Sequence, residues 1–298
     1  MLSEQPVSRP AAFRCDSLRK AYGKRAVLGG LGLCIEEGET VGLLGANGAG
    51  KTTLLKVLLG LTPADGGVAM IAGERSECLS AAVRAQIGYV PQIPSQFSWL
   101  TGQSMLRYVA AFYPDFDWNY TRALTERWKV SVNTPIGLLS PGQQQRLAIA
   151  RALGHRPRYL VLDEPIAALD PATRMAVIDE LASEHGARAV SILFSSHITG
   201  DLERLCSRFI VLAGGAIVFD ESRERCRAYR RATISGDEQS LARMSFAGCQ
   251  RVRKTQDGQR VIVGREGDIE EIARHAPAGV SVKSDEGPLE AIVSEWMQ

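Results

Sequence analysis

The feature that most constrains the fold of this chain is a glycine-rich stretch of eight residues, Gly45-Ala46-Asn47-Gly48-Ala49-Gly50-Lys51-Thr52. It fits the pattern G-x-x-x-x-G-K-[ST] without a mismatch. The apolar run Thr40 to Leu44 precedes it and the helical run Thr53 to Leu59 follows it. Glycine allows successive N–H groups to point inward, and a helix start adds free N–H groups of its own. The stretch therefore predicts a strand, a phosphate-binding loop and a helix.

The residue types in this loop predict a nucleotide triphosphate as the ligand. Lys51 would reach the β- and γ-phosphates, and Thr52 would give its hydroxyl to a magnesium ion. We expect Thr53, the next residue, to line the same site.

Apolar runs alternate with amphipathic stretches through the first two-thirds of the chain. Runs that turn residues bound, and that are buried on both faces, favour a mainly parallel sheet flanked by helices. We expect a helix from Ala172 to His185, opened by Asp170-Pro171 and stopped by Gly186. The predicted strands are Ala26 to Ile35, Thr40 to Leu44, Gln86 to Val90, Tyr159 to Leu162, Val190 to Phe194 and Phe209 to Leu212.

Two acids follow the apolar run Tyr159 to Leu162 directly. Acids at the end of a buried strand are costly unless they face a cation or a polar cleft. Asp163 is placed to hold magnesium through a water, and Glu164 to orient and polarise the attacking water as a general base. The alternative, a strand that ends in a polar turn, is weak beside the phosphate loop.

Near residue 221 the character of the chain changes. The segment Glu221 to Arg231 carries five arginines, and short strand-like and helix-like pieces follow it up to a terminal helix near 288–296. We expect domains at 1–221 and 222–298, the second a small α+β unit. The arginine cluster is interpreted first as a solvated helix face, with a contact to anionic lipid or a partner subunit as the alternative.

Composition excludes several classes of protein. Lys+Arg is 35 and Asp+Glu is 33, so the net charge of +2 gives no large basic field for nucleic acid. No apolar run approaches the ~18–20 residues of a membrane span. The six cysteines form no Cys-x-x-Cys pair, which excludes zinc-site spacing and favours small buried side chains in a reduced compartment.

Further motifs occur in an order that resembles the ATP-binding subunit of ATP-binding-cassette (ABC) transporters. The resemblance covers roughly Phe13 to Glu221 and implies an α/β fold. The implied fold is the P-loop NTPase cassette, with a RecA-like core, an antiparallel β-subdomain and a helical signature subdomain at about 93–150. The resembling motifs are Tyr22 in the adenine-stacking position, Gln92 of the Q-loop, Leu139-Ser140-Pro141-Gly142-Gln143 for the LSGGQ signature, Ala167-Ala168-Leu169-Asp170 for the D-loop, and the switch residue His197.

The resemblance implies a functional role for each of these residues, and each also has an alternative explanation as an ordinary structural residue. Gln92 would bond to magnesium or water, His197 would contact the γ-phosphate, and Tyr22 would stack on adenine. The alternative explanations are a surface glutamine, a satisfied loop histidine and a packing aromatic.

The signature and the D-loop are implied to act on a second copy of the chain. Ser140, Gly142 and Gln143 would cap the γ-phosphate of nucleotide held by the opposite subunit, and Asp170 would shape the dimer seam while also capping a helix. Pro141, Ala168 and Ile166 depart from the family pattern. We expect binding across the dimer to survive these changes, with altered geometry or turnover.

The implied function is hydrolysis of ATP with Mg²⁺ by a head-to-tail homodimer that drives an integral-membrane permease. The chain would be cytoplasmic, held on the inner face of the cell membrane by that permease, with no nucleic acid partner. The stretch Phe112 to Trp118 and Leu289-Glu290 near the C-terminus resemble exporters of the ABC-2 type. Candidate permease contacts, equally well explained as the helical lobe's own core, are Phe97, Trp99, Leu100 and Trp128.

Two other functions remain to be weighed. One is a soluble ABC-family ATPase without a transport role, disfavoured because no tandem cassette, long coiled coil or basic stripe is present. The other is a cassette that does not hydrolyse ATP, disfavoured because Asp163, Glu164 and His197 are all present.

Overall fold

The computed structural model describes residues 10–94, 97–197, 200–285 and 289–297. Its centre is a six-stranded sheet in the order β10-β9-β3-β8-β7-β6. All neighbours are parallel except the β9–β10 hairpin, so the predicted mainly parallel sheet is confirmed. The strands are β3 (Thr40–Leu44), β6 (Ile87–Val90), β7 (Tyr159–Asp163), β8 (Ser191–Ser196), β9 (Arg208–Ala213) and β10 (Ala216–Ser222).

An antiparallel sheet, in the order β2-β1-β4-β5, packs with helix α1 (Lys51–Leu58) against this centre. One core cluster joins Phe13 and Leu28 of that sheet to Leu54 of α1 and Leu193 of β8. The loop between β3 and α1 is thereby held against the turn that joins β1 and β2. The strands are β1 (Ala11–Tyr22), β2 (Arg25–Glu36), β4 (Gly66–Ile71) and β5 (Glu74–Arg75), followed by a 3₁₀ turn (Ser76–Cys78) and the short helix α2 (Ala81–Arg84).

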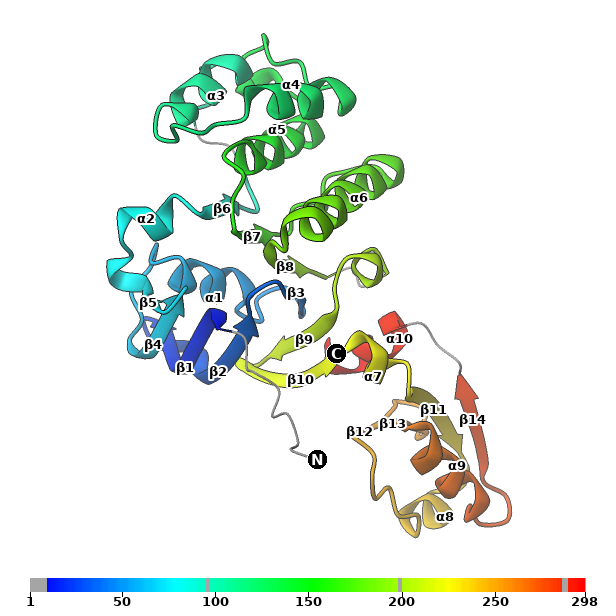
Figure 1. Cartoon of the computed structure of the whole chain (residues 1–298). Helices are drawn as coiled ribbons and strands as arrows, with labels where there is room; N and C mark the ends of the chain where they lie inside the picture. The colour runs from blue at the N-terminus through cyan, green and yellow to red at the C-terminus, as the bar shows by residue number, and fades with distance from the viewer. Residues whose placement is uncertain (1–9, 95–96, 198–199, 286–288, 298) are drawn as a thin grey trace, which may run out of the picture.

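Three helices form an arm that projects from the β6–β7 edge of the central sheet (Figure 1). They are α3 (Gly102–Ala110), α4 (Trp118–Arg127) and α5 (Pro141–Gly154), with a 3₁₀ turn at Ile136–Leu138 before α5. Trp128 is buried in the arm's core and Leu100 packs against it, whereas Trp99 is 73% exposed. Of the predicted permease contacts, Trp128 therefore belongs to the core.

Helix α6 (Pro171–Arg188) links β7 to β8 and is longer than expected. Asp170 caps it as predicted, accepting a hydrogen bond from the Thr173 N–H at 3.1 Å. The predicted stop at Gly186 is wrong, because the helix continues to Arg188. Ala189, with φ of 52°, ends it in the left-handed conformation. A 3₁₀ turn (Leu202–Arg204) precedes β9.

The C-terminal part is a β-α-β-β-α-β unit whose antiparallel sheet has the order β12-β13-β11-β14. This is a split βαβ arrangement with a small core of its own under α8 and α9. The predicted pieces are found here, and β12 is an additional strand. The elements are α7 (Arg223–Cys226), β11 (Tyr229–Ser235), α8 (Glu238–Ala242), β12 (Arg251–Lys254), β13 (Arg260–Arg265), α9 (Glu266–Arg274) and β14 (Ser281–Asp285).

The last helix, α10 (Leu289–Met297), packs back on the cassette. Ile292, Val293 and Trp296 join the core cluster that contains Phe219, whose ring centroid lies 4.8 Å from that of Trp296. Pro288, the predicted start of this helix, lies outside the described residues. The division at 221/222 remains a prediction.

Two expectations about surface chemistry need correction. Arg230 and Arg231 lie on β11 rather than on a helix face, and they pair with Glu266 and Glu295. All six cysteines are free, but only three are buried, with Cys34 and Cys78 exposed. Within the described ranges, no helix combines the length and apolar character that a bilayer span requires.

His155, at the end of α5, gives the fold a dependence on pH. Its Nε2–H donates to the Ile87 carbonyl at 3.1 Å, and its ring stacks on Tyr113 at 4.0 Å. Burial, together with smaller contributions from the charges of Arg151 and Arg188, lowers the pKa of His155 from 6.5 to about 4. The unfolded chain therefore takes up a proton that the folded protein excludes when the pH falls from about 6.5 to about 4.

We predict that His155→Phe, which keeps the stacked ring but cannot titrate, flattens the loss of stability in acid. Wild-type unfolding free energy should drop by up to about 1.4 kcal/mol more per pH unit than that of the variant between pH 6.5 and 4. Urea unfolding across this pH range measures the difference. Parallel pH profiles would contradict the assignment.

Candidate functional site

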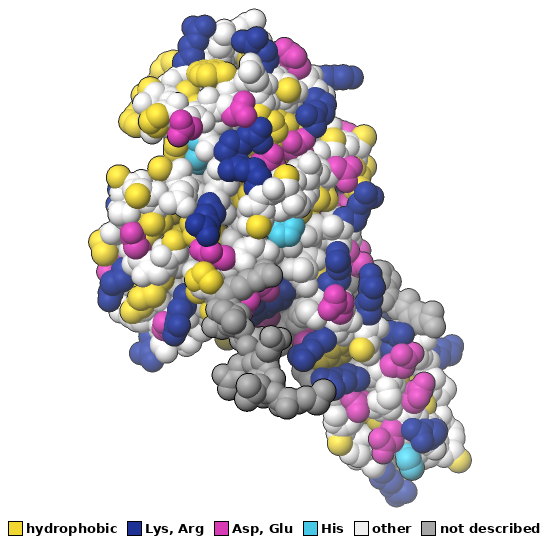
Figure 2. Space-filling view, in the orientation of Figure 1, with side chains coloured by type: hydrophobic (Ala, Val, Ile, Leu, Met, Phe, Trp, Pro, Cys, Tyr) yellow, Lys and Arg dark blue, Asp and Glu magenta, His cyan; other side chains and the backbone are white. Residues whose placement is uncertain are grey.

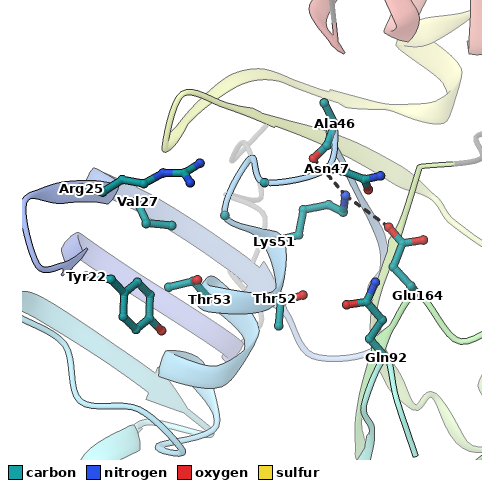
Figure 3. Close-up of a pocket in the computed structure, with 12 residues that line it drawn as sticks. Tyr22, Arg25, Val27, Ala46, Asn47, Lys51, Thr52, Thr53, Gln92 and Glu164 are labelled. Carbon is teal, nitrogen blue, oxygen red and sulfur yellow. Dashed lines mark hydrogen bonds and ion pairs between the residues drawn. The ribbon is translucent and has the colours of Figure 1, made fainter.

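A cavity of about 430 Å³ lies where the two sheets and α1 meet (Figure 3). It draws residues from the β1–β2 turn, from the glycine-rich loop with the start of α1, and from the ends of β6 and β7. The lining residues are Tyr22, Arg25, Val27, Ala46, Asn47, Gly48, Gly50, Lys51, Thr52, Thr53, Gln92 and Glu164.

The glycine-rich loop has the conformation that its sequence predicts. Gly45 and Gly50 have φ of 155° and 109°, and a Cβ on Gly45 would lie 2.5 Å from the Leu212 carbonyl oxygen. Gly45 and Ala49 shape the loop without lining the cavity. The loop leads into α1, whose first N–H groups have no partner within the helix and add positive potential. The cavity is thus suited to an anion such as a phosphate chain.

Lys51 and Glu164 form a buried ion pair at the floor of the cavity. Their charged atoms are 3.2 Å apart, and both side chains are only 6% exposed. The Lys51 amino group also donates to the Gly45 carbonyl at 2.6 Å, and Figure 3 shows it between the loop and Glu164. A buried cation at this point offers its charge to any anion that enters.

Glu164 is held in place from three sides. Its carboxylate lies 2.8 Å from His197 Nδ1, and its own N–H donates to the Ser195 hydroxyl at 3.0 Å. Its φ of 49° is a left-handed conformation that a residue with a Cβ rarely adopts. Such strain persists only where surrounding contacts fix it, and it turns this carboxylate towards the cavity.

Asp163 is buried directly behind Glu164. Its Oδ1 accepts a hydrogen bond from the Ser195 hydroxyl at 2.8 Å, whereas Oδ2 is buried without a partner among the described residues. Burial and the Asp163 charge raise the pKa of neighbouring Tyr89 to about 12. An orphaned carboxylate oxygen beside a cavity that Thr52 and Gln92 line fits a hydrated cation.

The oxygen donors of Thr52, Gln92 and Asp163 fit Mg²⁺ better than a metal that is coordinated entirely by protein side chains. Among the described residues, no group of three or more His, Cys, Asp or Glu could hold a metal ion. Mg²⁺ commonly takes one or two protein ligands and completes its shell with water and substrate phosphates. Thr52 and Gln92 would be those two ligands, and Asp163 would act through a water.

Tyr22 lies at the far end of the cavity from Glu164 and is half exposed (Figure 3). Behind it, Lys20 pairs with Asp65 at 2.8 Å and lies 5.6 Å from the Tyr22 ring centroid. A flat exposed ring at one end of a phosphate-binding cavity is placed to stack on a base.

Two lining residues, Arg25 and Val27, were missed by sequence reasoning. Arg25 extends towards the glycine-rich loop in Figure 3. They belong to no motif, and their only signal is their closeness along the chain to Tyr22, with Val27 inside the predicted strand Ala26 to Ile35.

The signature residues and Asp170 are not among the residues that line this cavity in the described part of the chain. Ser140 caps α5 in a reciprocal capping box with Gln143, and Pro141 takes the first helical position, where a missing N–H costs little. A Cβ on Gly142 would lie 3.1 Å from the Ala168 carbonyl oxygen, so the signature abuts the D-loop of its own chain.

Comparison with known proteins gives consistent matches. The ABC transporter family model matches residues 28–167. The uncharacterised ABC transporter ATP-binding protein YxlF of Bacillus subtilis is 33% identical over 207 residues, covering 68% of each chain. The Nod factor export ATP-binding protein I of Paraburkholderia xenovorans is 35% identical over 211 residues, covering 69% of each.

Solved structures share the fold. The structure of an ATP-binding subunit of an ABC transporter is 28% identical, with a TM-score of 0.66 over 72% of this chain and 92% of that one. The dimeric cassette MJ0796 bound to ADP and Pi is 24% identical, with a TM-score of 0.65 over 71% and 98%. The predicted α/β P-loop cassette is confirmed.

We predict that Lys51→Ala weakens ATP binding by about 10- to 150-fold, since it removes a charge-assisted contact of about 1.5–3 kcal/mol. Lys56→Ala, an exposed lysine on the same helix, is the control and should bind ATP normally. Fluorescent-nucleotide titration measures both. Unchanged affinity in a folded Lys51→Ala protein would contradict the phosphate-loop assignment.

Proposed function

The chain belongs to the ABC transporter family as an ATP-binding subunit that hydrolyses ATP to power transport, and on that premise we propose that two copies close head to tail around two ATP molecules. The proposal rests on one observation: the predicted site residues lie in two separate places on the folded chain. Lys51 and Glu164 line the cavity and His197 contacts Glu164, whereas Ser140 and Gly142 lie outside the cavity at a helix start.

A helix start is suited to an anion through its dipole and its N–H groups. At this start Pro141 has no N–H and the Gln143 N–H donates to Ser140, so the Gly142 N–H is the group offered to an anion. Each chain therefore carries one cavity that binds ATP and one separate element suited to the γ-phosphate. Two copies related by a two-fold axis satisfy both elements at once. ATP then acts as the link that closes the pair, and its hydrolysis opens the pair again.

Within each composite site, Lys51 and the loop N–H groups bind the phosphates. The phosphates compete with Glu164 for the Lys51 charge, so nucleotide frees the carboxylate to orient a water as general base. His197 holds Glu164 in position from the opposite side. Mg²⁺, held by Thr52, Gln92 and, through water, Asp163, would neutralise charge on the phosphate oxygens.

An integral-membrane permease is the proposed second partner. Four aromatic side chains of the arm, here called the aromatic patch, contact one another in two edge-to-face pairs and one tilted pair, with ring centroids 5.4–5.7 Å apart. They are 38–73% exposed, and Figure 2 shows hydrophobic side chains gathering over the arm. Exposed apolar surface of this kind suits a protein partner. The patch consists of Phe97, Trp99, Tyr108 and Phe112.

Export is the proposed direction of transport. Relatives such as the Nod factor export protein carry that function in their names, and the Phe112 to Trp118 stretch resembles ABC-2 exporters. Through its permease the subunit would sit on the cytoplasmic face of the cell membrane. The soluble alternative loses support, since these relatives are ATP-binding proteins of transporters.

We predict that Glu164→Gln lowers ATP turnover by at least about 100-fold, because the general base is lost. The same protein should still form ATP-dependent dimers. Phosphate release and light scattering with saturating Mg·ATP measure the two effects, and Glu224→Gln, an exposed glutamate outside the cavity, is the control. Rapid hydrolysis by Glu164→Gln would refute the base assignment. Monomers only, even with the native permease present, would refute the head-to-tail pair.

We predict that Trp99→Ser weakens co-purification with the permease by about 30-fold, the effect of removing a contact of about 2 kcal/mol. Its ATP binding should be unchanged, because Trp99 lies outside the cavity. Leu61→Ser, a 60%-exposed residue outside the patch, is the matched control. Equal recovery of the permease with both variants would exclude the aromatic patch as its docking surface.

A further inference from the structure

Helix α6 carries two buried carboxylates that the chemistry of the cavity does not use. Glu180 is 9% exposed and Glu184 is 7% exposed. They are four residues apart, so they lie on one face of the helix. This helix begins directly after the D-loop, at Pro171.

Three of the four carboxylate oxygens meet donors in the arm or in its connection with the sheet, and the fourth, on Glu184, meets Arg188 of α6 itself. The Tyr120 hydroxyl of α4 donates to Glu180 at 2.8 Å, and Arg127 of α4 pairs with the other oxygen of Glu180. Arg156, in the link from α5 to β7, contacts Glu184 at 2.5 Å.

Arg156 closes the network. Its guanidinium lies 3.4 Å from the Tyr120 ring centroid and contacts Asp117, the N-cap of α4, at 2.9 Å. We call the set the arm clamp; it consists of Asp117, Tyr120, Arg127, Arg156, Glu180 and Glu184.

The topology explains why the arm needs a clamp. Only two stretches of chain join the arm to the central sheet, one after β6 and one before β7. These strands are parallel neighbours at the edge of the sheet, so the two stretches attach at opposite ends of the strands. The two connections therefore leave the arm free, as far as covalent bonds are concerned, to rotate about an axis that passes through both of them. Polar contacts from α4 to α6 are a further attachment that resists this rotation.

The start of α6 lies beside the start of α5. Gly142 of the signature abuts the Ala168 carbonyl of the D-loop. Figure 1 shows α6 beneath the arm, on the side of the sheet. The two elements proposed to face the second copy are thus in contact at one end, while the arm clamp joins α4 to α6 further along.

We propose that Glu180 and Glu184 are positioning residues, which fix the arm to the D-loop helix so that Ser140, Gly142 and Asp170 reach the second copy as one unit. This inference rests on the proposed head-to-tail pair. Burying charged groups is costly, and an apolar contact would hold two helices equally well. An ionic network adds a defined orientation of the arm on α6, because the two oxygens of Glu180 meet separate donors on α4 and one oxygen of Glu184 meets Arg156.

The test uses Glu164→Gln as the parent protein, with Glu180→Gln and Glu184→Gln added singly and together. Two quantities are measured: the affinity of the monomer for ATP, and the ATP concentration that gives half-maximal dimer in the presence of Mg²⁺. We expect monomer affinity to stay within about twofold, while the concentration for half-maximal dimer rises about tenfold. Asp179→Asn, on the same helix but in a pair with Arg204 that is 61% exposed on both sides, is the control and should match the parent.

Tyr120→Phe provides a milder variant if the glutamine variants fail to fold. It removes one hydroxyl and keeps both carboxylates and the ring under Arg156, so it should shift dimerisation in the same direction by a smaller factor. A lowered melting temperature with unchanged dimerisation would show a purely structural role and overturn the inference. A parent that never dimerises would overturn the head-to-tail proposal and this inference with it, whereas a dimerising parent with unaffected clamp variants would overturn this inference alone.

Discussion

The buried pair of Lys51 and Glu164 is the interaction on which the rest of the site depends. Each charge would be costly to bury alone, and pairing the two charges lowers the free-energy cost of burying them at the floor of the cavity. In the proposed mechanism the pair also sets up the chemistry, because an entering phosphate would compete for Lys51 and leave the Glu164 carboxylate to act on water. Stability without ligand and reactivity with ligand thus use the same two groups.

Parallel strand order brings the partners of this pair together. The strands β3, β8, β7 and β6 are neighbours, and their carboxyl ends lead to the glycine-rich loop, His197, Glu164 and Gln92. A ligand site at the carboxyl ends of such a sheet is the general rule for open α/β folds. The antiparallel sheet adds the β1–β2 turn, which supplies Tyr22 and the unpredicted Arg25 and Val27.

The two halves of the proposed composite site lie on different parts of the chain, one at the central sheet and one on the arm. The groups proposed to bind and hydrolyse ATP lie at the carboxyl edge of the central sheet and at the start of α1, while the signature lies at the start of an arm helix. In the proposed pair, the orientation of the arm on the sheet would let one copy respond to nucleotide held by the other. The arm clamp lies where that orientation is set.

Local features were predictable from the amino-acid sequence. They include the glycine-rich loop, the buried strands and the acids after Tyr159–Leu162, because backbone freedom, burial and the cost of a buried charge act within a few residues. Where helices end and which surfaces meet depends instead on contacts in the folded chain. Gly186 did not stop α6, Trp128 turned inward, α10 packed on the cassette, and Glu180 met Tyr120 across 60 residues of chain. Packing between distant segments sets these outcomes, and no short window of sequence contains both partners.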